Sequence, residues 1–129
     1  MPAETFDDAR PPAVAVVDLD RRVQLALAEA MRAAGVDVVG TAGDISSALE
    51  LLDSGARVML VDPRLPDIAS GQALMSTISR DWPGVRIVIM GWGDSGESAA
   101  MVNCVCTFIS KSASPEEFVA AALEACATT

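Results

Sequence analysis

The sequence has no histidine and no tyrosine, and its only lysine is Lys111. Without histidine there can be no Ser-His or Cys-His nucleophile pair and no imidazole metal ligand. The chain also cannot carry a phosphoryl group on a histidine of its own. The cysteines number three, an odd count that fits a reducing cytoplasm, and the Cys104-Val105-Cys106 spacing is not that of a zinc site. Since the other basic residues are all arginine, Lys111 marks a place that needs a compact ammonium group, unless its isolation is chance.

The charge and the apolar content exclude further classes. The net charge of −9 argues against nucleic acid binding, which requires a basic surface. No segment approaches the roughly 18 unbroken apolar residues of a membrane helix. Met1 to Pro12 lacks the basic-then-apolar pattern of a secretory signal. We therefore expect a cytoplasmic protein that contacts neither nucleic acid nor membrane directly.

Short apolar runs alternate with segments of helical periodicity along the chain. The apolar runs predict five buried strands, at residues 13–17, 36–40, 58–61, 85–90 and 105–109. Helical spacing and capping residues predict helices at residues 20–34, 44–54 and 71–80, a weak short helix ending near residue 103, and a last helix at residues 114–125.

This alternation predicts a doubly wound α/β fold, in which right-handed crossovers place helices on both faces of a parallel sheet. We expect one such domain at residues 13–126, a flexible arm at residues 1–12 and a short tail at residues 127–129. In such sheets ligands bind at the carboxyl ends of the strands, near the switch in strand order.

Polar residues follow three of the predicted strands at that edge. Asp18 follows the first strand, Asp62 the third and Lys111 the fifth, while Gly91 follows the fourth. With the strand order 2-1-3-4-5, the first and third strands are neighbours. Two carboxylates and one ammonium group would then converge on one shallow pocket.

Three segments that contain these residues resemble the receiver domain of bacterial response regulators, over roughly residues 13–126. They are Val16-Val17-Asp18, Leu60-Val61-Asp62-Pro63-Arg64-Leu65-Pro66, and Phe108-Ile109-Ser110-Lys111 with the following Ser112 to Glu117. The last segment is similar to receivers that precede helix-turn-helix outputs. The resemblance implies a flavodoxin-like fold with strand order 2-1-3-4-5 and a role in two-component signalling, not an enzymatic one.

The resemblance also implies roles for individual residues. Asp62 would accept a phosphoryl group from the phosphohistidine of a sensor kinase, and Lys111 would contact that group. Asp18, Asp62 and the backbone carbonyl of Arg64 would hold Mg²⁺. In the family a hydroxyl residue after the fourth strand follows the phosphoryl group and draws an aromatic residue inward. Here these switch positions are Gly91 and Phe108.

The sequence departs from the family pattern around this pocket. Leu19 stands where the family has a second acid, and Asp20, one place on, is expected to point elsewhere. Gly91 has no hydroxyl group, and Pro63 has no N–H for a phosphoryl oxygen. The loop from Asp67 to Gly71 is about one residue longer than usual. We therefore expect weak or absent Mg²⁺ binding, and keep as an alternative a pseudo-receiver that binds a protein or small molecule without phosphorylation.

Two further expectations concern ligands and partners. Residues 91–96 match the dinucleotide-binding pattern G-x-G-x-x-G, but they follow the fourth strand and lack the acid required after the next one, so no nucleotide is expected there. The resemblance implies a sensor histidine kinase or another protein as partner, and a possible homodimer through the last strand and helix.

Overall fold

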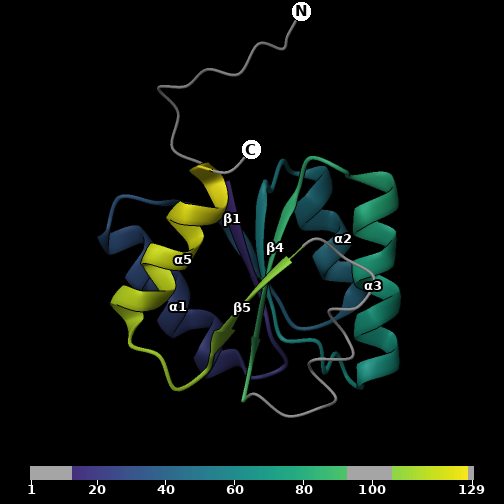
Figure 1. Cartoon of the computed structure of the whole chain (residues 1–129), viewed down its shortest axis with the longest axis horizontal. Helices are drawn as coiled ribbons and strands as arrows, with labels where there is room; N and C mark the ends of the chain where they lie inside the picture. Colours follow the sequence, from purple (N-terminus) through teal and green to yellow (C-terminus); the bar gives the residue numbers. More distant parts are fainter. Residues whose placement is uncertain (1–12, 93–105, 128–129) are drawn as a thin grey trace, which may run out of the picture.

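The computed structural model describes residues 13–92 and 106–127, which form a parallel sheet with helices on both faces (Figure 1). The strand order is β2-β1-β3-β4-β5, which confirms the predicted α/β fold and topology. The strands are β1 (Ala13–Val17), β2 (Asp37–Ala42), β3 (Val58–Val61), β4 (Arg86–Gly91) and β5 (Cys106–Ser110).

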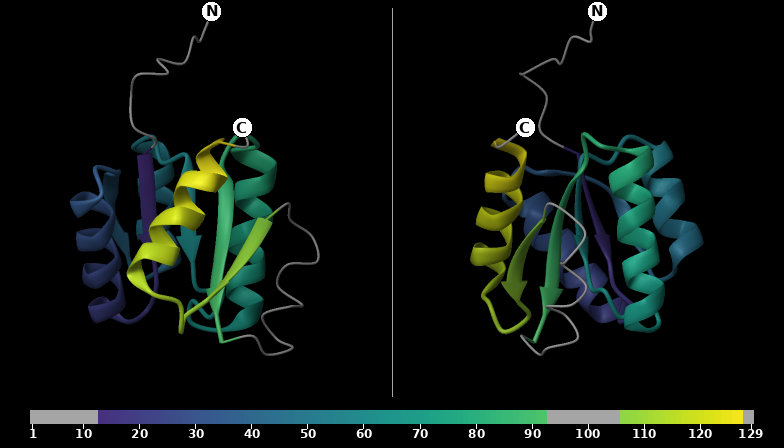
Figure 2. Two further views of the ribbon diagram at one scale, coloured as in Figure 1. Left: turned by 60° about the vertical axis from the view of Figure 1, so that its left-hand side comes forward. Right: turned by 45° about the vertical axis from the view of Figure 1, so that its right-hand side comes forward.

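Helices α1 (Arg21–Ala33) and α5 (Pro115–Ala127) cover one face of the sheet, and α2 (Ile45–Asp53) and α3 (Ile68–Asp81) cover the other (Figures 1 and 2). Because side chains alternate along a strand, β1 contributes to two separate cores. Val14 and Val16 pack toward α1 and α5, while Ala15 and Val17 pack toward α2 and α3. All four are fully buried, as the unbroken apolar run predicted.

Aspartate side chains fix the first turns of three helices. Asp20 accepts a hydrogen bond from the N–H of Arg22 at 2.9 Å, Asp44 from Ser47 at 2.8 Å, and Asp67 from Ser70 at 2.8 Å. Such caps satisfy backbone N–H groups that have no partner within the helix. These three caps fix where α1, α2 and α3 begin beside the carboxyl edge of the sheet.

The fourth cap is the one that the sequence predicted in most detail. The N–H of Ser114 donates to Glu117 Oε1 at 2.8 Å, and the N–H of Glu117 donates to Ser114 Oγ at 3.2 Å. This reciprocal pair is a capping box. Two helices also end at glycines, since Gly35 and Gly55 follow α1 and α2 and adopt the left-handed region at φ +83° and +102°.

The predicted boundaries differ from the structure mainly at α3. This helix begins at Ile68 rather than at Gly71, since Asp67 caps it and the intervening residues are helical. β1 and β3 have the predicted bounds, and the bounds of β2, β4 and β5 shift by one or two residues. The predicted arm, the short helix near residue 103, most of the 91–96 motif and Cys104 lie outside the described residues. Among the described residues, no helix is long and apolar enough to cross a membrane.

Candidate functional site

Three strand ends bring Asp18, Asp62 and Lys111 to one edge of the sheet. Backbone hydrogen bonds extend the sheet by one residue at each of these positions. The N–H of Asp18 donates to Ala42 O at 3.0 Å, that of Asp62 to Val17 O at 2.9 Å, and that of Lys111 to Gly91 O at 2.8 Å. The backbone of each residue is therefore hydrogen-bonded to the neighbouring strand.

The ammonium group of Lys111 lies between the two carboxylates. Its Nζ is 2.6 Å from Asp18 Oδ2 and 2.6 Å from Asp62 Oδ2. The side chain of Asp18 is 2% exposed, that of Lys111 11% and that of Asp62 13%. The predicted convergence of these three residues is present, and Asp62 is the more accessible of the two carboxylates.

The second oxygen of each carboxylate accepts a backbone N–H from the loop that follows it. Asp18 Oδ1 accepts from Asp20 at 2.8 Å, and Asp62 Oδ1 accepts from Arg64 at 2.9 Å. Pro63 has no N–H to offer, so the loop turns to present the next one. Both carboxylates thus have partners on both oxygens, and their orientation is fixed by the backbone as well as by Lys111.

The environment of Lys111 acts on its pKa in two directions. Burial by itself favours the neutral amine and lowers the pKa. The hydrogen bonds and charges of Asp18 and Asp62 outweigh burial, and the pKa of Lys111 is raised above its ordinary value. Lys111 is consequently a fixed positive charge at neutral pH.

Neither residue after Asp18 adds a carboxylate to this site. Leu19 is 51% exposed. Asp20 caps α1 and pairs with Arg22 at 3.4 Å, and these hydrogen bonds from Arg22 lower the pKa of its carboxyl. The expectation that Asp20 would point away from the pocket agrees with this geometry. Within residues 13–92 and 106–127, no group of three or more acidic, cysteine or histidine side chains is placed to hold a metal ion.

The two predicted switch positions lie on neighbouring strands but contribute little polar chemistry. Gly91 ends β4, is buried and pairs with Ser110 of β5. Phe108 pairs with Ile89 and is 39% exposed, so this aromatic ring is not packed into either core. An inward aromatic side chain, as the resemblance implied for the switched state, is therefore not present in this conformation.

Two residues near the site were not singled out from the sequence. Gln24 is 5% exposed, and its Nε2 donates to the carbonyl of Asp18 at 2.6 Å. Gly71 packs against the loop after Asp62 so closely that a Cβ would lie 1.8 Å from Pro63 O. The signal for Gln24 was a polar residue on the apolar stripe of α1, whereas Gly71 gave no signal beyond its place at a helix start.

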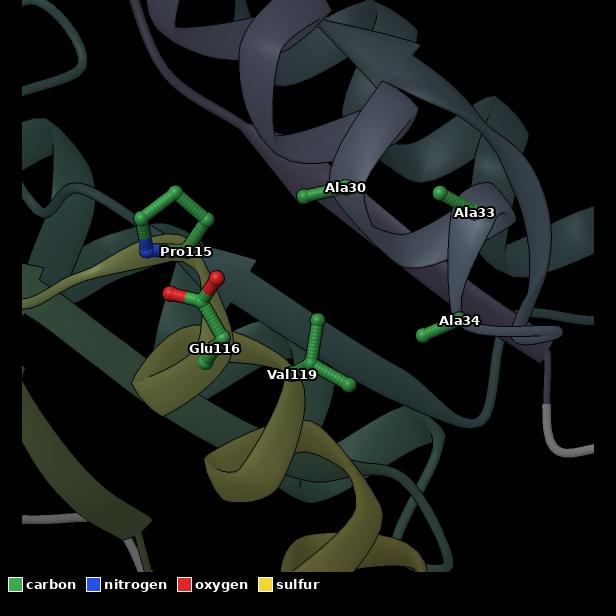
Figure 3. A pocket seen from close by; sticks show the side chains of 6 residues that line it. All are labelled: Ala30, Ala33, Ala34, Pro115, Glu116 and Val119. Carbon is green, nitrogen blue, oxygen red and sulfur yellow. The ribbon is translucent and has the colours of Figure 1, made fainter.

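A separate open groove of about 350 Å³ lies between α1 and α5 (Figure 3). Small side chains of α1 and the first turns of α5 form its walls, and none of the candidate site residues lines it. The lining residues are Ala30, Ala33, Ala34, Pro115, Glu116 and Val119.

Comparison with known proteins places the chain in a family. Residues 14–123 match the model of the response regulator receiver domain, and the chain belongs to this family. No curated protein matches the sequence.

Solved structures of similar fold are receiver domains as well. The signal receiver domain of an HD domain-containing protein from Pseudomonas fluorescens Pf-5 is 22% identical with a TM-score of 0.78, over 93% of this chain and all of that one. A CheY-like receiver domain protein from Methanospirillum hungatei JF-1 is 19% identical with a TM-score of 0.77, over 89% and 93%. The receiver domain of the putative response regulator NarL from Mycobacterium tuberculosis is 26% identical with a TM-score of 0.72, over 92% and 98%.

Proposed function

We propose that this receiver domain takes part in phosphorelay signalling by accepting a phosphoryl group on Asp62. The observation that carries the proposal is the position of the Asp62 carboxylate, which follows the central strand β3, is 13% exposed and lies 2.6 Å from Lys111 Nζ. Asp18 also contacts Lys111, but its side chain is only 2% exposed. An incoming phosphoryl group can therefore reach Asp62 and not Asp18.

The chemistry requires a nucleophile and nearby positive charge. A carboxylate oxygen of Asp62 attacks the phosphorus of a phosphohistidine on the partner kinase. The phosphorus–nitrogen bond breaks and its electron pair stays on the imidazole. Lys111 then stabilises the charge that spreads over the phosphoryl oxygens. Its ammonium group can donate three hydrogen bonds and lies 2.6 Å from an oxygen of each carboxylate, so a phosphoryl oxygen on Asp62 would come close to a cationic donor.

The residues present fit Mg²⁺ poorly. Asp18, Asp62 and the carbonyl of Arg64 are the available oxygen donors, and Lys111 Nζ is already within 2.6 Å of both carboxylates. Mg²⁺ requires near-octahedral oxygen ligands at about 2.0–2.1 Å, so it would have to displace Lys111 from that position. We infer that Mg²⁺ binds weakly or not at all, and that Lys111 supplies the positive charge here.

An alternative function is binding of a protein or small molecule without phosphorylation. Three features favour it: Leu19 is exposed in place of an acid, Gly91 offers no hydroxyl group, and Lys111 already neutralises Asp62. Under this alternative the pocket has a structural role, and regulation occurs through partner binding. If phosphorylation does occur, Gly91 and Phe108 remain the proposed switch positions, and Phe108 would change its exposure on phosphorylation.

The two functions are separated by intact-mass measurement after incubation with an acyl phosphate and Mg²⁺. A gain of one phosphoryl group in the wild type, absent in Asp62→Asn, would support phosphotransfer. An unchanged mass at long times would favour the alternative. A phosphoryl group found on Asp18 or Asp20 with Asp62 unmodified would contradict the assignment of the site.

The partner implied by phosphotransfer is a sensor histidine kinase. A second copy of the chain is also proposed as a partner, through β5 and α5, each of which has one large exposed apolar side chain. These are Phe108, 39% exposed, and Leu123, 45% exposed. Light scattering at increasing concentration tests the dimer, and a strict monomer at high concentration would refute it.

A further inference from the structure

Gln24 has an unusual place for an amide side chain. Within residues 13–92 and 106–127, Asp18 and Gln24 are the only buried side chains that are polar or charged. Gln24 lies on the face of α1 that also buries Leu27, Ala28 and Met31. An apolar residue would be ordinary at this position, and a buried amide is costly unless it forms hydrogen bonds. Its hydrogen bond to Asp18 therefore accounts for the residue type.

The contact is held between two loops at the carboxyl edge of the sheet. Gln24 Nε2 donates to Asp18 O at 2.6 Å in the loop between β1 and α1. Gly43, in the loop between β2 and α2, lies against the same contact, since a Cβ there would be 3.1 Å from Gln24 Nε2 and 3.6 Å from Asp18 O. The amide is enclosed on that side, which restricts the positions that it can adopt.

This hydrogen bond completes the set of contacts that orient Asp18. The N–H donates to Ala42, Oδ1 accepts from Asp20, and Oδ2 contacts Lys111. The carbonyl oxygen is the remaining polar atom, and Gln24 is the side chain that binds it. Asp18 is thus held by three hydrogen bonds and, at Oδ2, by the ion pair with Lys111, and only the bond from Gln24 comes from a helix side chain.

We propose that Gln24 is a positioning residue, which holds the peptide group of Asp18 so that the Asp18 carboxylate shares Lys111 with Asp62. The proposal rests on the proposed function in one respect, which is that Lys111 and Asp62 form the working site. Without the amide donor, the Asp18 carbonyl is a buried acceptor with no partner, and the peptide turns to find one. The carboxylate of the same residue moves with it, and Lys111 is left with Asp62 alone.

Because Lys111 is the only lysine of the chain, its environment can be read by amine labelling. We would measure the rate at which a limiting amine-reactive ester modifies Lys111 in the folded protein. Fragment mass spectrometry would locate the label, with the α-amino group of the purified protein as internal reference. Gln24→Met keeps the length of the side chain and removes the donor. Leu27→Val is the matched control, since it weakens the core packing of the same helix and removes no hydrogen-bond donor.

Gln24→Met should increase the labelling rate of Lys111 by about fivefold, the factor that one intramolecular hydrogen bond typically contributes to an equilibrium. Leu27→Val should leave the labelling rate of Lys111 unchanged, even if it lowers the stability of the domain as much as Gln24→Met does. Asp18→Asn should increase the rate as well, and adding Gln24→Met to it should have no further effect, because Gln24 acts through Asp18. Unchanged labelling in Gln24→Met, an equal rise in Leu27→Val, or multiplicative effects in the double variant would each overturn the proposal.

This test needs no phosphodonor, so its outcome is independent of phosphorylation at Asp62. If the labelling results are as expected and Asp62 is never phosphorylated, the positioning role stands and the proposed phosphotransfer fails. If Asp62 is phosphorylated but Lys111 in Gln24→Met is labelled at the wild-type rate, the proposed phosphotransfer stands and the positioning role of Gln24 fails.

Discussion

Replacement of Lys111 by methionine should leave the two carboxylates of the pocket without a cation, so that an added cation stabilises the variant. In the wild type, Lys111 Nζ lies 2.6 Å from one oxygen of Asp18 and 2.6 Å from one oxygen of Asp62. Those two oxygens are therefore at most about 5.2 Å apart. Methionine has a similar length and no charge, so Lys111→Met leaves two carboxylates facing each other with nothing positive between them.

The loss of stability expected for Lys111→Met follows from this distance between the two carboxylate oxygens. Two unit charges about 5 Å apart repel by roughly 3 kcal/mol at an effective dielectric constant near 20. Removal of one partner from a buried ion pair costs about 3–5 kcal/mol in other proteins, and the site here is slightly exposed, so we expect the lower end. For a domain of this size, a loss of about 3 kcal/mol lowers Tm by roughly 10 °C.

The assay is thermal unfolding of the wild type, Lys111→Met and Arg80→Met, with and without Mg²⁺. Arg80→Met removes the same charge from an exposed pair with Asp81, in which the side chains are 70% and 47% exposed, so its Tm should hardly change. If Mg²⁺ binds Lys111→Met with a Kd near 1 mM, then 10 mM Mg²⁺ should raise the free energy of unfolding of this variant by about 1.4 kcal/mol and its Tm by roughly 4 °C. An unchanged Tm in Lys111→Met, or equal Mg²⁺ shifts in this variant and the wild type, would refute the reasoning.

Three further changes test other parts of the structure. Gly71→Ala should lower the free energy of unfolding, measured in urea, by about 3 kcal/mol or more, because its Cβ would lie 1.8 Å from Pro63 O. An unchanged urea midpoint would show that α3 and the loop after Asp62 separate easily. Leu19→Asp should strengthen Mg²⁺ binding measured by calorimetry, and adding Gly91→Thr should improve the response to phosphorylation; equally tight Mg²⁺ binding in the wild type and Leu19→Asp would contradict the incomplete ligand set. Since the pKa of Lys111 is raised, its stabilising effect should be fully present below the unfolded pKa of about 10.4 and disappear as pH rises through the folded value; the stability difference between the wild type and Lys111→Met should therefore narrow only in strongly alkaline solution.

Much of the fold could be predicted from the sequence because its signals are local and repeat. Each strand is a short apolar run, and for β1 and β3 the run ends at the site residue itself, Asp18 or Asp62. Parallel strands place such ends on one edge, so the meeting of these two residues with Lys111 followed from topology alone. Nothing in this step required knowledge of side-chain contacts.

The details that could not be predicted concern residues with two possible structural roles, between which the sequence does not decide. Asp20 had two possible uses, as a pocket carboxylate or as a helix cap, and the local geometry of α1 decided for the cap. The start of α3 was missed for a related reason. Asp67 and Ser70 contain the signal of a cap, but Gly71 suggested that the loop continued, whereas the glycine serves close packing inside the helix.

Phe108 shows a different limit of sequence reasoning. The resemblance gave it a switch role with an inward position, and alternation along a strand predicts only which face a residue occupies. β5 is an edge strand with a neighbour on one side only, so its two faces need not be equally covered. The observed exposure of 39% reflects that position and could not be derived from the pattern of the strand itself.

The charge of the pocket determines what a phosphoryl group would meet there. Two carboxylates and one ammonium group give a net charge of −1, and a phosphoryl group brings about −2 more. If Asp62 is phosphorylated, one of its carboxylate oxygens becomes the bridging oxygen of an acyl phosphate, so the charge of that carboxylate is lost and its hold on Lys111 weakens. Asp18 keeps its charge, so Lys111 would remain beside it and could donate only to a phosphoryl oxygen within reach of that position. The orientation of Asp18, and with it the Gln24 amide behind its carbonyl, then decides whether Lys111 can contact the phosphoryl group. The buried carboxylate of Asp18, which is not the proposed phosphoryl acceptor, would then set the response to phosphorylation.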